Sequence, residues 1–212
     1  MANRPNTEQR RAEIVNGLLL TLAEHGYAQA TIQLIAKRVG LAPGLVHYHF
    51  KTKAEILVEL VKTLADQFRS RYAHLAQSAH SPEDFLFAYV NARLAKGEGE
   101  NPAVVAAWVM IGSEAVRLPE VRAIYQQAIA AEFSLLKGLL SDYLASEQKS
   151  VDNVDQLTAA MVSLMEGAFQ IASGAPNVMP VGYAATTAIT LIQRYVAAQA
   201  SAAPGLSHNR YP

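Results

Sequence analysis

The sequence predicts an all-α protein of about nine helices. Alanine and leucine dominate, runs of aromatic or β-branched residues are sparse, and apolar residues recur three and four positions apart nearly throughout. The chain has 212 residues, of which 51% are hydrophobic, so it can bury a core in one large or two small domains. An ordinary globular helical protein is therefore expected.

Composition narrows the possible functions. The chain has no cysteine, which excludes disulfides and thiolate metal ligands. No apolar run approaches the ~20 residues that cross a bilayer, and residues 1–9 lack the apolar stretch of a signal peptide. We therefore expect a cytoplasmic protein without a membrane partner.

The distribution of charge is uneven although the net charge is zero. Residues 1–53 hold seven Lys or Arg against three Asp or Glu, and the remainder holds eleven against fifteen. A basic segment on an acidic body is expected when one part of a protein touches a polyanion, although the same excess can be an ordinary solvated surface.

The first helix is expected to begin near Asn6 or Thr7 and to end at Gly26. Asn6 with Gln9 fits a capping box, and glycine is a common C-terminal stop. Two short helices follow at residues 31–38 and 43–49. The Thr31 hydroxyl can cap the first of these helices, and the turn between them contains Gly40, which can adopt the left-handed conformation.

Pro43 suits the first turn of the second short helix, because its fixed φ is already helical. Two brief helices with this spacing predict a helix-turn-helix. A long amphipathic connector helix is expected from about Lys53 to just before residues 78–81. Further helices are predicted to run from Ser81 to about Lys96 and over residues 102–116, 119–144, 152–173 and 183–200.

The last two predicted helices are rich in small and apolar side chains. Faces this apolar at a chain terminus usually pack on something large, and a partner subunit is the natural candidate. The apolar residues are Leu157, Met161, Leu164, Ala168 and Ile171 in one helix, and Ala188, Ile189, Ile192, Tyr195 and Val196 in the other.

The stretch from Thr31 to Leu57 reads TIQLIAKRVGLAPGLVHYHFKTKAEIL. It contains Thr-x-x-x-Ile-Ala, Val-Gly, Gly-x-x-x-Tyr-x-Phe and Lys-x-Lys in that order. In combination these motifs resemble the core of the DNA-binding domain of the TetR (tetracycline repressor) family. The resemblance is strong over residues 7–60 and rests on helix count and length beyond them.

The resemblance implies a sequence-specific transcriptional regulator of double-stranded DNA. It implies a homodimeric repressor that binds an inverted-repeat operator and is released by a small-molecule effector. The corresponding parts are a helix-turn-helix domain at 1–53, an effector-binding and dimerisation domain at 54–200 with its connector helix at 54–77, and a flexible tail at 201–212. In this family the last two helices form the dimer.

The resemblance also assigns DNA contacts. A short helix held by its neighbour can enter the ~12 Å wide major groove, where Gln pairs with adenine and an apolar group can meet a thymine methyl. Carried over position by position, the residues at base edges are Gln33, Pro43, Gly44 and His47, and those at phosphates are Thr31, Tyr48, His49 and Lys53.

The second short helix departs from the family pattern. Ala42, Pro43 and His47 stand where the family often has serine, a basic residue and tyrosine, so this helix is poor in charge. We expect an unusual operator, and we expect the phosphate affinity to depend on Arg10, Arg11, Lys37, Lys51 and Lys53.

The helical body is expected to hold the effector. Its segment NPAVVAAWVMIGSEAVRLPEVRAIYQQ loosely resembles the ligand domain of the choline-sensing regulators in the family. An apolar pocket with a few polar anchors is typical of small-molecule sites. The expected lining residues are Phe85, Tyr89, Trp108, Glu114, Tyr125, Met165 and Phe169.

Other interpretations of these residues stay open. The aromatic side chains can be plain core. Glu114 and Glu166 lie among apolar residues, and burial of an unpaired carboxylate is costly. Each therefore either has a basic or hydroxyl partner within the protein or is paired when a ligand binds. Trp108 with Glu114 can hold a cationic ligand.

No cofactor and no metal are expected. His47 and His49 have a ligand-type spacing, but residues two apart do not share a helix face, and no third ligand is evident nearby. An enzyme could use Glu114, Glu166 or Tyr125 as acid or base, yet no nucleophile, phosphate loop or metal-ligand spacing accompanies them. A DNA-binding regulator without a ligand is the remaining alternative.

Overall fold

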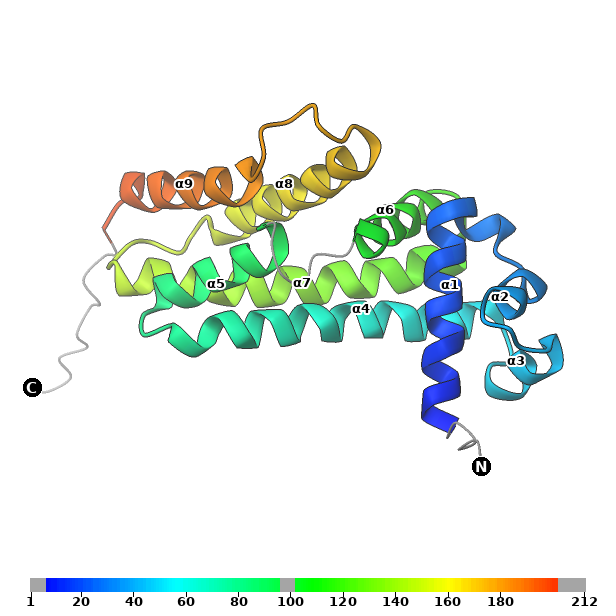
Figure 1. Ribbon diagram of the computed structural model, residues 1–212. Helices are drawn as coiled ribbons and strands as arrows, with labels where there is room; N and C mark the ends of the chain where they lie inside the picture. Colours follow the sequence, from blue (N-terminus) through cyan, green and yellow to red (C-terminus); the bar gives the residue numbers. More distant parts are fainter. Residues whose placement is uncertain (1–6, 96–101, 202–212) are drawn as a thin grey trace, which may run out of the picture.

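The computed structural model describes residues 7–95 and 102–201. Within these ranges the protein has nine α-helices and no named β-strand, which confirms the predicted all-α class (Figure 1). The helices are α1 Thr7–Gln29, α2 Ile32–Arg38, α3 Pro43–His49, α4 Lys53–Leu75, α5 Pro82–Leu94, α6 Pro102–Ala115, α7 Pro119–Ser146, α8 Val154–Gly174 and α9 Tyr183–Ala198.

Helix α1 is interrupted at Gly26, where the sequence predicted its end. This residue has φ 74° and ψ 167°, a conformation that is essentially restricted to glycine, and a short helical turn to Gln29 follows it. The expected capping box of Asn6 falls outside the described residues.

The helix-turn-helix has the predicted local chemistry. Thr31 Oγ1 accepts a hydrogen bond from the Leu34 amide at 3.2 Å and caps α2. Gly40 has φ 66° at the end of α2, and the next amide, of Leu41, donates to the Ala36 carbonyl at 2.9 Å. Pro43 occupies the first turn of α3. The turn is therefore closed by backbone bonds that need little help from side chains.

Helices α4 and α5 each begin with a side-chain cap. Thr52 Oγ1 accepts from the Glu55 amide at 3.1 Å at the start of α4. Ser81 and Asp84 form a reciprocal capping box at the start of α5, where the sequence predicts a helix to begin. These caps fix where each helix begins and how the chain enters it.

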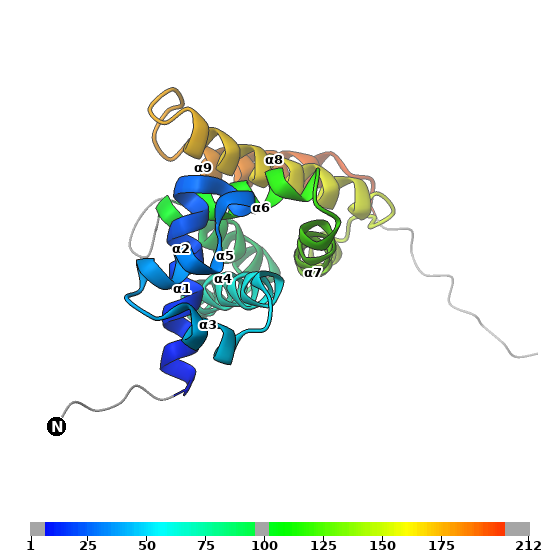
Figure 2. The same ribbon diagram turned by 90° about the vertical axis from the view of Figure 1, so that its right-hand side faces the viewer.

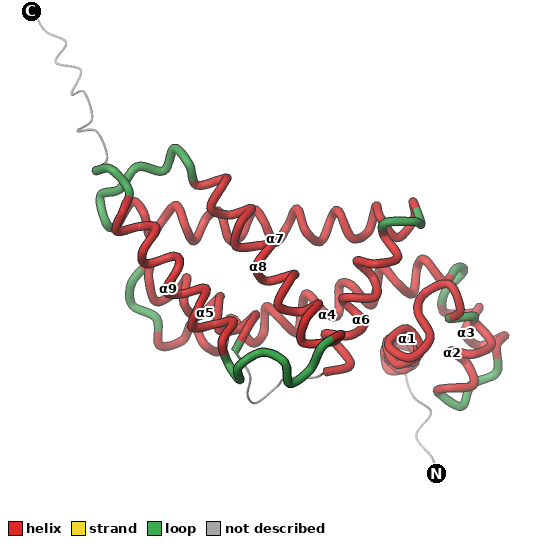
Figure 3. Tube along the Cα trace, turned by 90° about the horizontal axis from the view of Figure 1, so that it is seen from above, coloured by secondary structure: helices red, strands yellow, loops and turns green. Residues whose placement is uncertain are grey.

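The molecule is elongated, with α1, α2 and α3 at one end (Figures 1 and 2). Helices α4 and α7 run along its length, and α8 and α9 lie on the side opposite α4. Seen from that side, α9 lies over α5 and α8 over α7, with which they are in contact (Figure 3). No described helix is long and apolar enough to cross a membrane.

Two hydrophobic clusters form the interior. The first joins α1, α2 and α3 to the first half of α4, to α6 and to the start of α7. The second joins α5, the later part of α7, α8 and α9. The first cluster crosses residue 53, where the sequence places the boundary of the DNA-binding domain, because α1 packs extensively on α6.

Part of the apolar surface expected to face a partner subunit is buried within the chain. Ala188, Ile192 and Val196 of α9 lie in the second cluster, together with Leu157 and Met161 of α8. The described outer surface of α9 instead includes Leu191, which is exposed. The repeating apolar residues of α8 and α9 therefore pack within the chain, in addition to any contact that they make with a partner subunit.

Candidate nucleic-acid interface and internal cavity

Helices α2 and α3 lie at one end of the molecule (Figure 2), and most of the predicted DNA-contacting side chains on them are exposed to solvent. Buried Val46 and Phe50 anchor α3 on the first hydrophobic cluster. The residues that are exposed on the outside are Thr31, Gln33, Pro43, Gly44, His47 and Tyr48. A rigidly held short helix with an outward polar and glycine surface is suited to enter a groove.

His49 and Lys53 are placed differently. His49 is half-buried, and its carbonyl accepts a hydrogen bond from Arg11 Nη1 at 2.8 Å. Lys53 Nζ donates to the Tyr27 carbonyl at 2.7 Å and lies 4.0 Å from the Tyr27 ring centroid. Burial lowers the pKa of Lys53, although nearby Glu120 and Glu114 act against this. Lys53 thus makes contacts within the protein and is only partly exposed, and its role as a phosphate contact stays a prediction.

The basic residues that were expected to bind phosphates are unequally available. Arg10 pairs with Glu13 at 2.7 Å, and Arg11 pairs with Glu59 at 3.4 Å while its guanidinium lies over the Phe50 ring. Lys37 and Lys51 are exposed and have no ion pair with any described residue. These two lysines are the most accessible cations near α2 and α3.

A polar joint connects this end to the body. The Tyr27 hydroxyl donates to Glu120 at 3.2 Å, next to the start of α7, and burial beside that carboxylate raises the pKa of Tyr27. Glu114 near the end of α6 is buried, packs close to Gly26 and pairs with Arg117 at 3.2 Å. Both acids therefore serve the contact between α1 and the helices α6 and α7.

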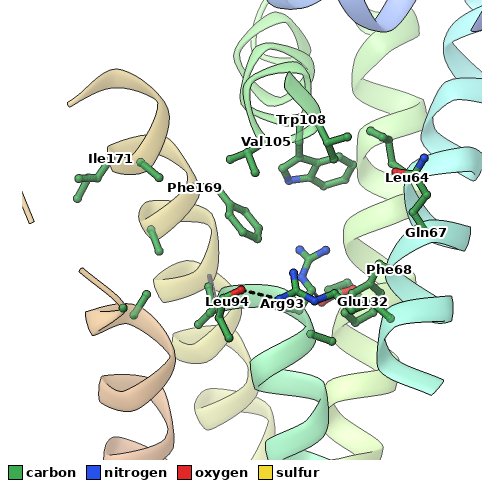
Figure 4. A pocket seen from close by; sticks show the side chains of 18 of the residues that line it. Leu64, Gln67, Phe68, Arg93, Leu94, Val105, Trp108, Glu132, Phe169 and Ile171 are labelled. Atoms are coloured by element: carbon green, nitrogen blue, oxygen red, sulfur yellow. Dashed lines mark hydrogen bonds and ion pairs between the residues drawn. The ribbon is translucent and has the colours of Figure 1, made fainter. Parts of the chain in front are cut away.

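A cavity of about 600 Å³ lies between the two hydrophobic clusters. Its walls come from α4, α5, α6, α7, α8 and the segment that leads into α9 (Figure 4). Apolar side chains dominate these walls, among them Leu64, Val105, Phe169 and Ile171. This size and lining are typical of a site for a small molecule.

Buried charges gather on one wall of the cavity. Arg93 Nε lies 3.1 Å from Glu132 Oε1, and Arg93 Nη2 lies 3.5 Å from Glu166 Oε1. The side chains of Arg93, Glu132 and Glu166 are 14%, 11% and 25% exposed, so all three are largely removed from water. Each depends on its partners, because an unpaired buried charge is costly.

Neutral donors complete this cluster. Trp108 Nε1 donates to Glu166 Oε2 at 2.9 Å, the Tyr125 hydroxyl donates to the same oxygen at 2.8 Å, and the Tyr89 hydroxyl donates to Glu132. Burial, and then the neighbouring carboxylates, raise the pKa of both Tyr89 and Tyr125. The phenols therefore stay protonated and keep donating.

The structure brings together only part of the predicted effector set. Trp108 and Phe169 line the cavity. Tyr89 and Tyr125 stand behind the wall as donors to Glu132 and Glu166, and Met165 is buried in the second cluster. Phe85 is exposed outside the cavity, and Glu114 lies at the joint with α1.

The suggested pair of Trp108 and Glu114 is therefore corrected. Trp108 is bonded to Glu166 instead, because Glu114 faces the other way, toward Gly26. Of the alternatives left open for the two acids, the structure shows that both have partners.

Comparisons with known proteins decide the family. Residues 16–60 match the description "Bacterial regulatory proteins, tetR family". Residues 82–201, more than half of the chain, match "BetI-type transcriptional repressor, C-terminal". The protein belongs to the TetR family.

Curated relatives of this TetR-family chain are regulators. The protein named "HTH-type transcriptional regulator BetI" from Agrobacterium fabrum is 30% identical over 113 residues, which are 53% of this chain and 54% of the relative. The one from Rhizobium meliloti is 28% identical over 53% of this chain and 55% of its own length. In these two alignments the chain spans about half the length of the relatives. The one from Cronobacter sakazakii is 27% identical over 92% of this chain and 93% of the relative.

Solved structures share the TetR-family fold. A transcriptional regulator from Pseudomonas aeruginosa superposes with a TM-score of 0.75 at 17% identity, covering 92% of this chain and 91% of that one. A regulator from Saccharomonospora viridis, solved in complex with choline, gives a TM-score of 0.70 at 18% identity, covering 90% and 97%. At these identities the likeness shows the fold alone.

Sequence reasoning missed the charged residues of the cavity in this TetR-family chain. Arg93 and Glu132 occupy positions that look like ordinary exposed polar positions of amphipathic helices, as does Arg71, which also lines the cavity. No signal in the sequence could have found them, because Phe68 and Phe169 come near Arg93 only after α4, α5 and α8 assemble. No spacing along the chain encodes that meeting.

Proposed function

We propose that this protein is a sequence-specific transcriptional repressor of double-stranded DNA that is released by a small molecule held in the cavity. The observation that carries the proposal is the direct packing contact that links the cavity to the DNA-binding end of the molecule. Trp108 on the cavity wall and Glu114 against Gly26 belong to the same helix, α6, which packs on α1. The regulator names of the relatives support the same function.

Recognition of DNA would be made by α3, supported by α2. Gln33 and His47 would reach base edges, and Pro43 with Gly44 would allow close apolar contact, because both are exposed and a Cβ added at Gly44 would meet no protein atom within 4 Å. Thr31, Tyr48, Lys37 and Lys51 would meet phosphates, which set the register of the protein on the duplex.

Release would be a population shift. An effector between the two clusters would favour the arrangement of α6 that fills the cavity best, and α6 would carry α1 and its attached helices with it. Effector and operator must then weaken each other by the same factor. One structural neighbour was solved in complex with choline, which supports binding of a small molecule by a protein of this fold.

The operator-binding form would be a homodimer through α8 and α9. The outer side of α8 carries small residues, including Ser163 and Gly167, and α9 exposes Leu191. Small side chains allow the helices of two subunits to approach closely, and a two-fold dimer matches an inverted repeat with half-sites about 34 Å apart.

Selection from a pool of random duplexes at near-physiological salt tests the DNA-binding role. Enrichment of an inverted repeat is expected, and loss of enrichment in His47→Ala with Gln33→Ala would locate the reading surface. Binding without enrichment would leave only the phosphate attraction and would overturn the proposal of sequence-specific repression.

The effector role has a built-in probe. Trp108 is the only tryptophan of the chain, and it lines the cavity. A compound that enters the cavity should change tryptophan fluorescence and lower operator affinity together. A compound that changes fluorescence and leaves operator affinity intact would favour a regulator whose cavity is uncoupled from DNA.

A further inference from the structure

The cavity already contains a cation of its own. The Arg93 guanidinium lies between Phe68 of α4 and Phe169 of α8, with its central carbon 5.0 Å from each ring centroid (Figure 4). Glu132 and Glu166 pair with it from α7 and α8. Aromatic faces beside carboxylates are the setting that binds an organic cation, and here a protein side chain fills it.

The two carboxylates already have partners within the protein. Both oxygens of Glu166 are engaged, by Trp108, Tyr125 and Arg93, and the Oε1 of Glu132 is engaged by Tyr89 and Arg93. An ammonium ligand that approached these carboxylates would lie close to the Arg93 guanidinium, which adds like-charge repulsion in a site largely removed from water.

Positive groups, in contrast, have unused capacity. Arg93 Nε is buried and has no hydrogen-bond acceptor with suitable geometry among the described residues, despite its 3.1 Å distance to Glu132. Arg71 on the same cavity donates to the Ala95 carbonyl at 2.6 Å but pairs with no described carboxylate. Two guanidinium groups and one carboxylate, Glu132, thus line the cavity.

We propose that the cavity binds an amphipathic molecule with an acidic head group, a carboxylate, and that Arg93 makes it discriminate against organic cations. The carboxylate would accept hydrogen bonds from Arg71 and Arg93, and the apolar tail would lie along Val105, Phe169 and Ile171. This inference rests on the proposed function, because it names the class of effector for the same site.

Three probes with one tail and different heads test the proposal on the full-length protein. They are decanoate, decanol and decyltrimethylammonium, each titrated below its micelle concentration with Trp108 fluorescence and calorimetry as readouts. Decanoate should bind about tenfold or more tightly than decyltrimethylammonium, the factor expected for one charge-assisted hydrogen bond. Equal or tighter binding of the ammonium compound would overturn the proposal.

Variants separate the head-group contact from general damage. Arg71→Gln should weaken decanoate about tenfold and leave decanol unchanged, since Arg71 has no described carboxylate to leave uncompensated. Arg69→Gln is the matched control, because Arg69 lies on the same helix, is exposed, pairs with Asp66 and does not line the cavity. A decanoate affinity unchanged by Arg71→Gln would count against the proposal.

Arg93→Gln carries the second half of the test. It frees Glu132 and Glu166, so the preference should move toward decyltrimethylammonium if the variant stays folded by circular dichroism. If it unfolds, the Arg71 result decides. Failure of all three probes to bind would refute this inference while operator selection still stood, whereas failure of selection would refute the proposed repressor independently of the probes.

Discussion

At the scale of single residues, the two ends of the protein use side chains in opposite ways. On α3 the side chains proposed to read DNA are exposed and make few contacts inside the protein. Beside the cavity several charged groups are held by polar partners, as Glu166 is by Trp108, Tyr125 and Arg93. Substitutions on α3 should therefore change function with little effect on folding, and substitutions around the cavity should change both.

Gly44→Ala tests the first half of that contrast. A Cβ at Gly44 would meet no protein atom within 4 Å, so stability should hold or rise slightly, while operator affinity should fall about tenfold or more if α3 enters the groove there. Gly138→Ala is the matched control on α7, where a Cβ also meets nothing. Thermal melts and operator titrations give the two readouts, and unchanged operator affinity in Gly44→Ala would argue against close approach of this residue to DNA.

At the scale of elements, the contact between α1 and α6 is the part that joins the two sites. It depends on the sharp interruption at Gly26, whose added Cβ would lie 3.2 Å from Met110 and 3.4 Å from Glu114. The Lys53 bond to the Tyr27 carbonyl holds the chain just beyond that interruption. A shift of α6 would therefore be felt first at the end of α1.

Gly26→Ala should destabilise the protein by roughly 1–3 kcal/mol, the usual cost of a non-glycine residue in such a conformation. The free energy of unfolding from denaturant titration measures this. Gly138→Ala, at an ordinary helical position, should instead be neutral or stabilising by up to about 1 kcal/mol. Equal effects in the two variants would show that the interruption at Gly26 is not strained for alanine.

At the scale of the whole molecule, buried tyrosines tie the helices together. Tyr27, Tyr89, Tyr125 and Tyr143 each donate to a carboxylate on another helix, and burial raises the pKa of each above its usual value of 10. The folded state therefore holds these protons more tightly than the unfolded chain does.

Stability should consequently be retained below pH 10 and lost as the pH rises above it, since there the unfolded chain releases phenolic protons that the folded protein keeps. Phenolate absorbance in native protein should lag behind that in denaturant, and denaturant midpoints should fall over the same range. Tyr125→Phe should make the decrease in stability with rising pH less steep. Superimposable native and denatured titrations would contradict the inferred protection.

The proposed dimer can be tested at the same scale. Gly167→Arg on the outer side of α8 should give a monomer with weaker operator binding, because a long charged side chain would keep the two α8 helices apart. Gly138→Arg places the same side chain at an exposed position of α7 and should stay dimeric. Light scattering distinguishes the two, and a dimeric Gly167→Arg would place the interface elsewhere.

The sequence by itself determined the helical class, most helix starts and the helix-turn-helix. Those features depend on local chemistry: Thr31 and Ser81 cap the helices that they precede, Gly40 closes the turn, and apolar residues repeat with the helical period. Trp108 and Phe169, two of the residues expected near an effector, line the cavity, and their contact with an effector stays a prediction.

Only the tertiary structure decided which charges meet. Arg93 reaches Glu132 and Glu166 across 39 and 73 positions of sequence, and no periodicity relates residues so far apart. The same holds for Lys53, because its contact with the Tyr27 carbonyl joins residues 26 positions apart and could not be predicted from the sequence. Local propensity acts within a few residues, so the helices and their order could be predicted from the sequence. Ion pairs and cavity walls depend on how whole helices pack against one another, so the charged character of the cavity could not.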